Sequence, residues 1–367
     1  MKKWLKRALL VVVLLVVVAA AGLCVVYASR FQTLATMQKL TAYDDGFNIY
    51  QMEVKYDYSP EDVIAYGITD QQSAVDAILK EALPLLPISM EAPEFGCTAF
   101  QMTDVDGDVH MGRNYDLRNA TSAMLVYCAP ENGYRSVGVA GLDNVGANAP
   151  DRSLIQRMAT LTAPFICLDG MNEMGVSIAV LSLNSPPVNH QTEKPNIMTT
   201  LAVRLVLDHA ATTEEAVTLL EGYDMFAMGG WDYHFYITDA SGDARVVEYD
   251  CDDPARPLVA TKTDVVSNFF IMYQDRVPMD RDDDLYGFGL DRYEAVSAVL
   301  STAREKNVGT VWKAMRAVAK NPKVLRDVST TQWSIDYNNT QQTMEIVLRC
   351  DWNNRIQYSL AEAASGS

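Results

Sequence analysis

The sequence predicts an α+β fold in which two packed β-sheets are covered by helices. Three observations support this fold class. A β-hairpin is expected at residues 97–113, a pair of helices separates two groups of strands in the middle of the chain, and further strands follow near its end. Of the 367 residues, those after an apolar N-terminal run are enough for one large domain, or for a domain with an added segment.

The first 30 residues predict a membrane anchor. A basic start at residues 2–7 precedes an uncharged apolar run at residues 8–27, which is long enough to span a bilayer. Signal peptides that are removed have a shorter apolar region of roughly 7–15 residues. We therefore expect a single-pass signal anchor at residues 1–30 and favour it over secretion after signal cleavage. The basic flank then stays inside, and the rest of the chain lies outside the cytoplasm.

The remainder of the chain is strongly acidic. It carries 25 Lys and Arg against 47 Asp and Glu, a net charge of −22, and it therefore repels phosphate backbones. No basic stripe, zinc-type Cys/His spacing or phosphate-binding glycine loop occurs, so we expect no nucleic-acid partner, cofactor or metal. Outside the anchor and besides Cys97, four cysteines allow either two disulfides or four thiols. They are Cys128, Cys167, Cys251 and Cys350.

Residues 31–96 are expected to form a segment of their own. It contains an alternating strand at residues 47–56, a helix that starts at Ser59 and Pro60, and a second helix from about residue 69 to 83. Prolines at 84, 87 and 93 then impose an extended approach to Gly96. A glycine can hold a strained conformation in which the next thiol attacks the preceding carbonyl. We therefore expect a processing boundary between Gly96 and Cys97.

The hairpin brings a thiol, a guanidinium and a carboxylate together. A strand at residues 97–102 turns at residues 104–107 and returns at residues 109–113, so Arg113 and Asp116 come back toward Cys97. The cation favours the thiolate, and the carboxylate can hold a proton-carrying partner. These residues predict a nucleophilic cysteine, with a buried structural thiol as the alternative. The aspartates of the turn lack the glycine and the closing glutamate of a calcium loop, and indicate a turn only.

Periodicity and turn residues predict the elements after the hairpin. Strands are expected at residues 122–128, 134–139, 165–168, 176–183, 233–238, 244–249, 258–268, 331–336, 343–350 and 355–360, and helices at residues 196–209, 213–222, 290–306 and 308–320. Residues 169–175 are expected to form a turn between two buried strands.

The spacing within the hairpin resembles the opening of the choloylglycine hydrolase and N-acylethanolamine acid amidase family. Cys97-Thr98 is followed, at offsets of 15 to 19, by Gly112-Arg113-Asn114-Tyr115-Asp116. The run Asp-Gly-Met-Asn-Glu-x-Gly at 169–175, the run Leu-Asn-Ser-Pro at 183–186 and the run Trp-Ser-Ile-Asp-Tyr at 333–337 resemble further motifs of this family. The resemblance covers roughly residues 95–361.

The resemblance implies a linear amide C–N hydrolase of the N-terminal-nucleophile class, with a four-layer αββα fold. Residues 31–96 would be a prosegment or small subunit, and residues 97–367 the amidase domain. The implied site consists of the nucleophile Cys97, released by cleavage after Gly96, with Arg113, Asp116, the oxyanion-hole residue Asn184, Asn268 and Arg292. The substrate would be a small N-acyl amide. The sequence leaves open the acyl group (bile acid, fatty acyl or phenoxyacetyl), the choice between hydrolysis and acyl transfer, and the oligomeric state.

Two other interpretations stay open. The four histidines, of which His110 is expected to be exposed near the hairpin turn, allow a Cys–His hydrolase or acyltransferase without self-cleavage. Alternatively, the chain is a catalytically silent, membrane-anchored binding domain, which would tolerate an intact bond between Gly96 and Cys97.

Overall fold

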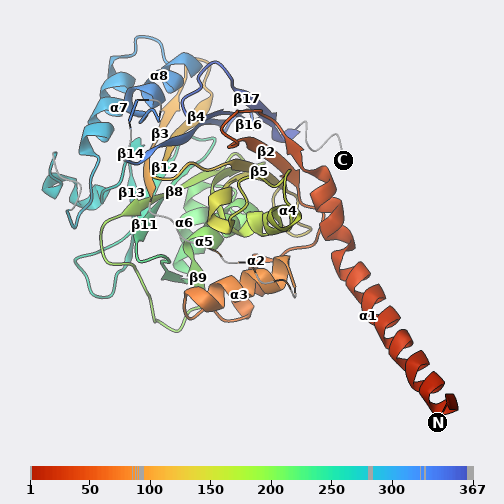
Figure 1. Cartoon of the computed structure of the whole chain (residues 1–367). Helices are drawn as coiled ribbons and strands as arrows, with labels where there is room; N and C mark the ends of the chain where they lie inside the picture. The colour runs from red at the N-terminus through yellow and green to blue at the C-terminus, as the bar shows by residue number, and fades with distance from the viewer. Residues whose placement is uncertain are drawn as a thin grey trace.

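Two β-sheets pack against each other and carry helices on their outer faces. The computed structural model describes residues 2–84, 86, 88, 90, 95–279, 284–322, 324–325 and 328–361. Helices α7 (Leu290–Thr302) and α8 (Val308–Val318) cover a six-stranded sheet, which packs on a nine-stranded sheet backed by α5 (Thr199–His209) and α6 (Thr213–Glu221) (Figure 1). The layered α+β prediction is confirmed.

The six-stranded sheet contains the predicted hairpin. Its strands lie in the order β14 (Val265–Val266), β3 (Phe95–Thr103), β4 (Val109–Leu117), β15 (Thr330–Asn338), β16 (Thr343–Leu348) and β17 (Ile356–Ser359). Every neighbouring pair is antiparallel. Within the hairpin, Cys97 stands opposite Tyr115, and Gly96 stands opposite Asp116. This register, set by the turn, positions the candidate site.

The nine-stranded sheet includes strands from the N-terminal segment. Its order is β1 (Gln38–Lys39), β2 (Ile49–Glu53), β5 (Ala123–Cys128), β6 (Ser136–Gly141), β7 (Cys167–Asn172), β8 (Ser177–Leu183), β11 (Asp232–Thr238), β12 (Ala244–Tyr249) and β13 (Leu258–Lys262). Strand β2 pairs with β5 in parallel, whereas the other neighbours are antiparallel. Segment 31–96 is therefore built into the sheet.

The remaining elements are short. They are α2 (Pro60–Ala65), α3 (Gln71–Ala82), α4 (Leu154–Ala159), the 3-10 helices Leu142–Val145, Thr160–Phe165 and Ile271–Arg276, and the parallel pair β9 (Asn196–Met198) and β10 (Asp224–Phe226). Side-chain caps start several helices. Ser59, as the sequence predicts, accepts from the backbone of α2, and Asp70 forms a capping box with α3.

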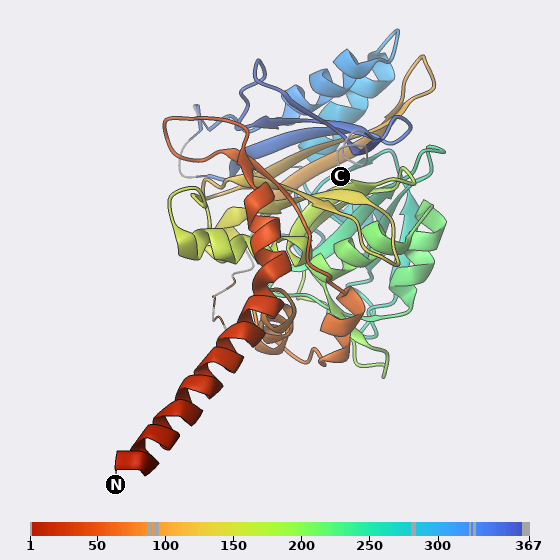
Figure 2. The same cartoon turned by 90° about the vertical axis from the view of Figure 1, so that its right-hand side faces the viewer.

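The N-terminal helix α1 (Lys2–Thr36) extends away from the domain (Figure 2). Its last turns pack against the body of the protein, where Tyr27 and Leu34 are buried and Arg30 donates to the Ala82 carbonyl at 2.8 Å. Within the parts of the chain that the structure describes, no helix is long and apolar enough to cross a membrane.

One continuous hydrophobic core joins the inner faces of the two sheets. It takes in residues of segment 31–96, such as Ile49, Met52 and Ile78, together with residues of both sheets. The cysteines are thiols and not disulfides: Cys128, Cys167 and Cys350 are buried, and Cys251 is partly exposed. Of the two options left by the sequence, the structure has thiols at these positions.

Three predicted elements need correction. The expected strand at residues 258–268 breaks after Lys262, because the chain crosses from the nine-stranded to the six-stranded sheet before β14. The expected helix at residues 196–209 begins with β9, which pairs with β10. Asp169 lies inside β7 rather than in a turn, since buried partners hold its carboxylate. The break after Lys262 matters most, because it places Ser267 and Asn268 against Cys97.

Candidate active site

The thiol of Cys97 is fully buried beside a guanidinium. Arg113, on the neighbouring strand β4, donates from Nη2 to Cys97 Sγ at 3.3 Å and to the Val180 carbonyl at 2.8 Å. Burial raises the pKa of the Cys97 thiol to about 11, even though the charge of Arg113 opposes the shift. In this structure, the Cys97 thiol is therefore mostly protonated at neutral pH.

A buried carboxylate holds Arg113 in place. Asp169 of β7 pairs with Arg113 Nη1 at 2.7 Å, and neither side chain is exposed. Burial works against the charge of Arg113, yet Asp169 raises the pKa of this guanidinium. On β15, Tyr337 and Trp333 donate to Asp169 at 2.5 and 3.3 Å. The cation beside the thiol is thus fixed by both sheets.

The backbone of Cys97 is held on both sides. Its N–H donates to Asn268 Oδ1 at 2.7 Å, and its carbonyl accepts from Ser267 Oγ at 3.2 Å and from Arg292. Arg292 also donates to Asn268 Oδ1 at 2.8 Å, and Asn268 donates to the Ser182 carbonyl at 2.9 Å. These contacts place the peptide unit of Cys97 between β14, α7 and β8.

A glycine at the start of α7 leaves room for the Arg292 side chain beside Ser267. Gly289 caps the start of α7 with a φ of +85°, a conformation that costs glycine little. A Cβ at this position would collide with the Arg292 guanidinium and with Ser267 Oγ. Because Gly289 has no side chain, the start of α7 lies directly against Arg292 and Ser267.

Asp116 faces Gly96, the residue before Cys97. It stands opposite Gly96, and a Cβ added to Gly96 would lie 3.8 Å from Asp116 Oδ2. Thr331 donates to Asp116 Oδ1 at 2.7 Å, whereas Oδ2 is buried with no hydrogen-bond donor in the part of the chain that the structure describes. Burial raises the pKa of Asp116, and Arg292 and Lys320 oppose the shift. One Asp116 oxygen next to Gly96 is thus an unused acceptor.

Gly96 does not have the strained backbone that the sequence led us to expect. It lies in β3 and is not among the glycines with positive φ. Added atoms at its Cα would meet Asp116 only at ordinary contact distances. The proline-marked approach at positions 87 and 93 lies outside the described residues.

Five of the six site residues meet around one peptide unit. Cys97, Arg113, Asp116, Asn268 and Arg292 are joined by the contacts above or by strand register. Asn184 is half-buried and directly follows β8, two residues after Ser182, which accepts from Asn268. Its part in an oxyanion hole stays a prediction, as do the catalytic roles of the other residues.

Within the described residues, no histidine hydrogen-bonds to the Cys97 thiol. His190 and His209 hydrogen-bond to the Arg256 carbonyl and to Glu61, respectively. His234 contacts Glu248 and the Ser267 carbonyl. His110, expected to be exposed, is 3% exposed and stands opposite Met102, five residue pairs along the hairpin from Cys97. The geometry therefore offers no imidazole base for a Cys–His pair.

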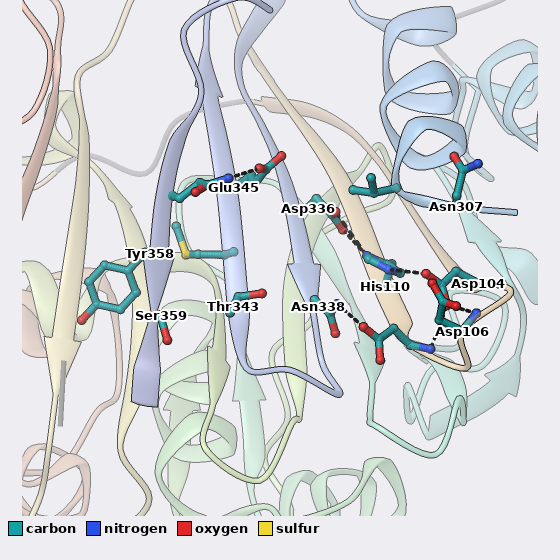
Figure 3. Close-up of a pocket in the computed structure, with 14 residues that line it drawn as sticks. Asp104, Asp106, His110, Asn307, Asp336, Asn338, Thr343, Glu345, Tyr358 and Ser359 are labelled. Carbon is teal, nitrogen blue, oxygen red and sulfur yellow. Dashed lines mark hydrogen bonds and ion pairs between the residues drawn. The ribbon is translucent and has the colours of Figure 1, made fainter. Parts of the chain in front are cut away.

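The surroundings of His110 form an acidic cavity at the far end of the hairpin. This cavity of about 530 Å³ is lined by the turn, β15, β16 and β17. Figure 3 shows His110 between two carboxylates, with Asp336 3.0 Å from Nδ1 and Asp104 3.6 Å from Nε2. Among the residues described, no group of three or more His, Cys, Asp or Glu side chains is arranged to hold a metal ion.

Sequence reasoning missed three residues that shape this site. Asp169 was assigned to a turn, Ser267 to a plain strand, and His234 to no element of the site. The position of His234 could have been inferred from the hairpin of β11 and β12, because pairing Phe235 with Val247 places His234 opposite Glu248.

The chain matches a protein-family model and the folds of solved enzymes. Residues 97–253 match the model of linear amide C-N hydrolases, choloylglycine hydrolase family. Penicillin V acylase from Agrobacterium tumefaciens shares 19% identity at a TM-score of 0.53, with 72% of this chain and 87% of that chain covered. A mutant conjugated bile acid hydrolase from Clostridium perfringens shares 16% identity at a TM-score of 0.55, with 72% and 93% covered. No curated protein matches.

Proposed function

Since the chain belongs to the choloylglycine hydrolase family of linear amide C–N hydrolases, we propose that Cys97, once freed as an N-terminal residue, is its nucleophile. One observation carries the proposal. The thiol, nitrogen and carbonyl of Cys97 are each held by a separate buried group, and the family match begins at this residue. A merely structural cysteine needs no guanidinium on its sulfur and no amide oxygen on its backbone nitrogen.

The first step is cleavage of the bond between Gly96 and Cys97. The Cys97 sulfur attacks the Gly96 carbonyl carbon, the C–N bond breaks, and the nitrogen takes up the proton of the thiol. Water then hydrolyses the thioester to the Gly96 carboxylate and restores the thiol. Asn268 Oδ1, 2.7 Å from the Cys97 nitrogen, holds the leaving amine, and we assign the unused oxygen of Asp116, which stands opposite Gly96, to accept its new hydrogens.

The second step uses the freed α-amine as a base. An unperturbed α-amine has a pKa near 8, so near neutral pH a fraction of it is unprotonated and accepts the thiol proton. The thiolate attacks the carbonyl carbon of an N-acyl amide, the amine departs with a proton, and water hydrolyses the thioester. Arg113 stabilises the sulfur anion, and we assign Asn184 to the developing oxyanion.

Product analysis tests this function. Purified protein is incubated with a conjugated bile acid, a phenoxyacetyl amide and an N-fatty-acyl amide, because the solved neighbours include a penicillin V acylase and a bile acid hydrolase. We expect the free acid and amine from at least one of them, and none from Cys97→Ala. Hydrolysis by Cys97→Ala at the wild-type rate would contradict the assignment of the nucleophile. No hydrolysis by the cleaved wild type across a wider amide panel would favour a silent binding domain.

We also propose that residues 1–30 anchor the chain in a membrane, with the enzyme outside the cytoplasm. The proposal is supported by the basic start, by the uncharged run of the sequence, and by α1 side chains such as Leu10 and Leu14, which are 71% and 62% exposed. Protease added to intact cells or spheroplasts should degrade the domain. Protection of the domain until the membrane is breached would contradict this orientation.

We further propose that segment 31–96 stays bound after cleavage, as a small subunit. Strand β2 pairs along its length with β5. Tyr58 donates to Asp208 at 3.0 Å, and Tyr56 donates to the Leu161 carbonyl at 2.6 Å. Loss of the segment would expose a row of unpaired β5 backbone groups and a large apolar area, which is costly in water.

A further inference from the structure

A buried histidine lies behind the loop that holds Cys97. His234 is on β11, where it stands opposite Leu181 of β8, and it is 0% exposed. Glu248 of β12 is also 0% exposed and lies 3.1 Å from His234 Nδ1. Neither residue touches the thiol.

Both ring nitrogens of His234 face oxygen acceptors. Nδ1 faces the Glu248 carboxylate, and Nε2 lies 3.0 Å from the Ser267 carbonyl oxygen. A neutral imidazole has one N–H, so its other nitrogen would point a lone pair at an oxygen lone pair. The imidazolium has two N–H groups and donates to both oxygen atoms. The Glu248 carboxylate also accepts from two backbone donors, Ile271 N–H at 2.7 Å and Met272 N–H at 3.1 Å.

We infer that His234 is a positively charged positioning residue, which holds the loop of residues 267–272 against the nucleophile. The ion pair holds this loop at two places. His234 binds the Ser267 carbonyl, and Glu248 binds the N–H groups of Ile271 and Met272. Ser267 in turn donates to the Cys97 carbonyl at 3.2 Å, and the next residue, Asn268, accepts from the Cys97 N–H. The inference rests on the proposed function for its effect on rate, but not for the charge itself.

The other charged groups around His234 are already paired or lie beyond the loop. On the same strand, Asp232 pairs with Arg256, and Tyr236 donates to the Thr263 carbonyl at 3.1 Å. Strand β8 contributes no titratable side chain. Across the loop, Arg292 of α7 binds the Cys97 carbonyl and Asn268. Glu248 is thus the carboxylate that contacts the imidazolium.

Two donors on the His234 ring are needed to hold the loop at both places. A neutral ring donates to only one of its two acceptors, so either the Ser267 carbonyl or the Glu248 carboxylate faces a lone pair in a dry interior, which is costly. The loop then holds the Cys97 backbone less firmly. Both self-cleavage and amide hydrolysis should therefore be slower in a variant that loses one of these two contacts.

Nitrogen NMR tests the charge without any assay of activity. The full-length Cys97→Ala protein, which stays uncleaved, is labelled with ¹⁵N-histidine, and the His234 signals are assigned by their loss in His234→Asn. With four histidines in the chain, the spectrum is tractable. We expect both ring nitrogens of His234 to be protonated at neutral pH. A neutral tautomer would overturn the inference, whatever the enzyme does.

Rates of self-cleavage and hydrolysis test the role. Glu248→Gln removes the charge of the pair at nearly unchanged volume, so self-cleavage and kcat should fall by about tenfold or more, with KM near the wild-type value, because a displacement of about 1 Å at a reacting group can cost about 10²-fold. The matched control is Glu61→Gln, because the Glu61–His209 pair is a histidine–carboxylate contact at the surface; its rates should equal the wild type's. An unchanged kcat in Glu248→Gln, or a loss of activity that only follows a loss of folded protein, would show a structural role only.

Discussion

Replacing Asp169 by Asn should destabilise the fold far more than a similar change four residues later in the same motif. Asp169 and Glu173 both belong to the run Asp-Gly-Met-Asn-Glu, and both pair with an arginine. Asp169 pairs with Arg113 at 2.7 Å, and both side chains are fully buried. Glu173 pairs with Arg135, and these side chains are 23% and 44% exposed. The two substitutions make the same chemical change in opposite environments.

The magnitudes follow from burial. Asp169→Asn leaves the Arg113 guanidinium in a dry interior without its counter-charge, and it weakens the acceptor of Tyr337 and Trp333. Breaking a buried pair from one side costs about 3–5 kcal/mol. Glu173→Gln breaks a solvated pair, which is worth about 0–1 kcal/mol. We expect a difference of at least about 2 kcal/mol between the two variants.

Urea unfolding measures both variants in the Cys97→Ala background, so that every molecule remains one chain. Tryptophan fluorescence reports the transition, because Trp333 lies in the affected cluster. If the free energy of unfolding falls with urea concentration at the same slope in both variants, the lower midpoint of Asp169→Asn gives the free-energy difference directly. If Asp169→Asn unfolds at the same midpoint as Glu173→Gln, Arg113 does not depend on its buried partner, and our account of how the site is held is wrong.

Three further predictions concern the site, the cavity and the N-terminal segment. Asn184→Ala should lower kcat by about 10²–10³ with little change in folding stability; an unchanged kcat on a good substrate would remove Asn184 from the site. Burial lowers the pKa of His110, but the Asp336 and Asp104 carboxylates more than offset this, so the pKa is raised. The contacts of His110 with these carboxylates should therefore stabilise the fold at acidic pH and lose this effect as the pH rises through the raised pKa. The melting temperature of His110→Asn should lie below the wild type's at acidic pH, and a difference that does not shrink with rising pH would contradict the prediction. After cleavage, residues 31–96 should co-elute with the catalytic part in size-exclusion chromatography, and separate elution would refute a retained subunit.

Local patterns in the sequence were sufficient to predict the hairpin that carries the site. Alternation in β3 and β4 and the turn at residues 104–107 fix which residues face each other, so Arg113 and Asp116 could be placed near Cys97 before any coordinates. Helix starts at Ser59 and Asp70 were readable for the same reason, since a cap acts within one turn. Asn268 and Arg292 were found through the family resemblance alone.

Contacts between distant parts of the chain were not predictable in this way. Asp169 reads as a turn residue until Arg113, from the other sheet, is packed against it. The run at residues 258–268 alternates like one strand, and only the packing of two sheets shows that it must cross between them. His110 looked exposed because it is close to a turn, but Asp336, more than two hundred residues later, covers it.

Intact-mass measurement with N-terminal sequencing tests the central claim most directly. A cysteine whose α-amine acts as base must be the first residue of its chain, so active wild-type protein should contain a polypeptide that begins at Cys97. Cys97→Ala should remain full length and inactive, because the same sulfur serves both cleavage and hydrolysis. Amide hydrolysis by wild-type molecules that all retain the bond between Gly96 and Cys97 would contradict the mechanism.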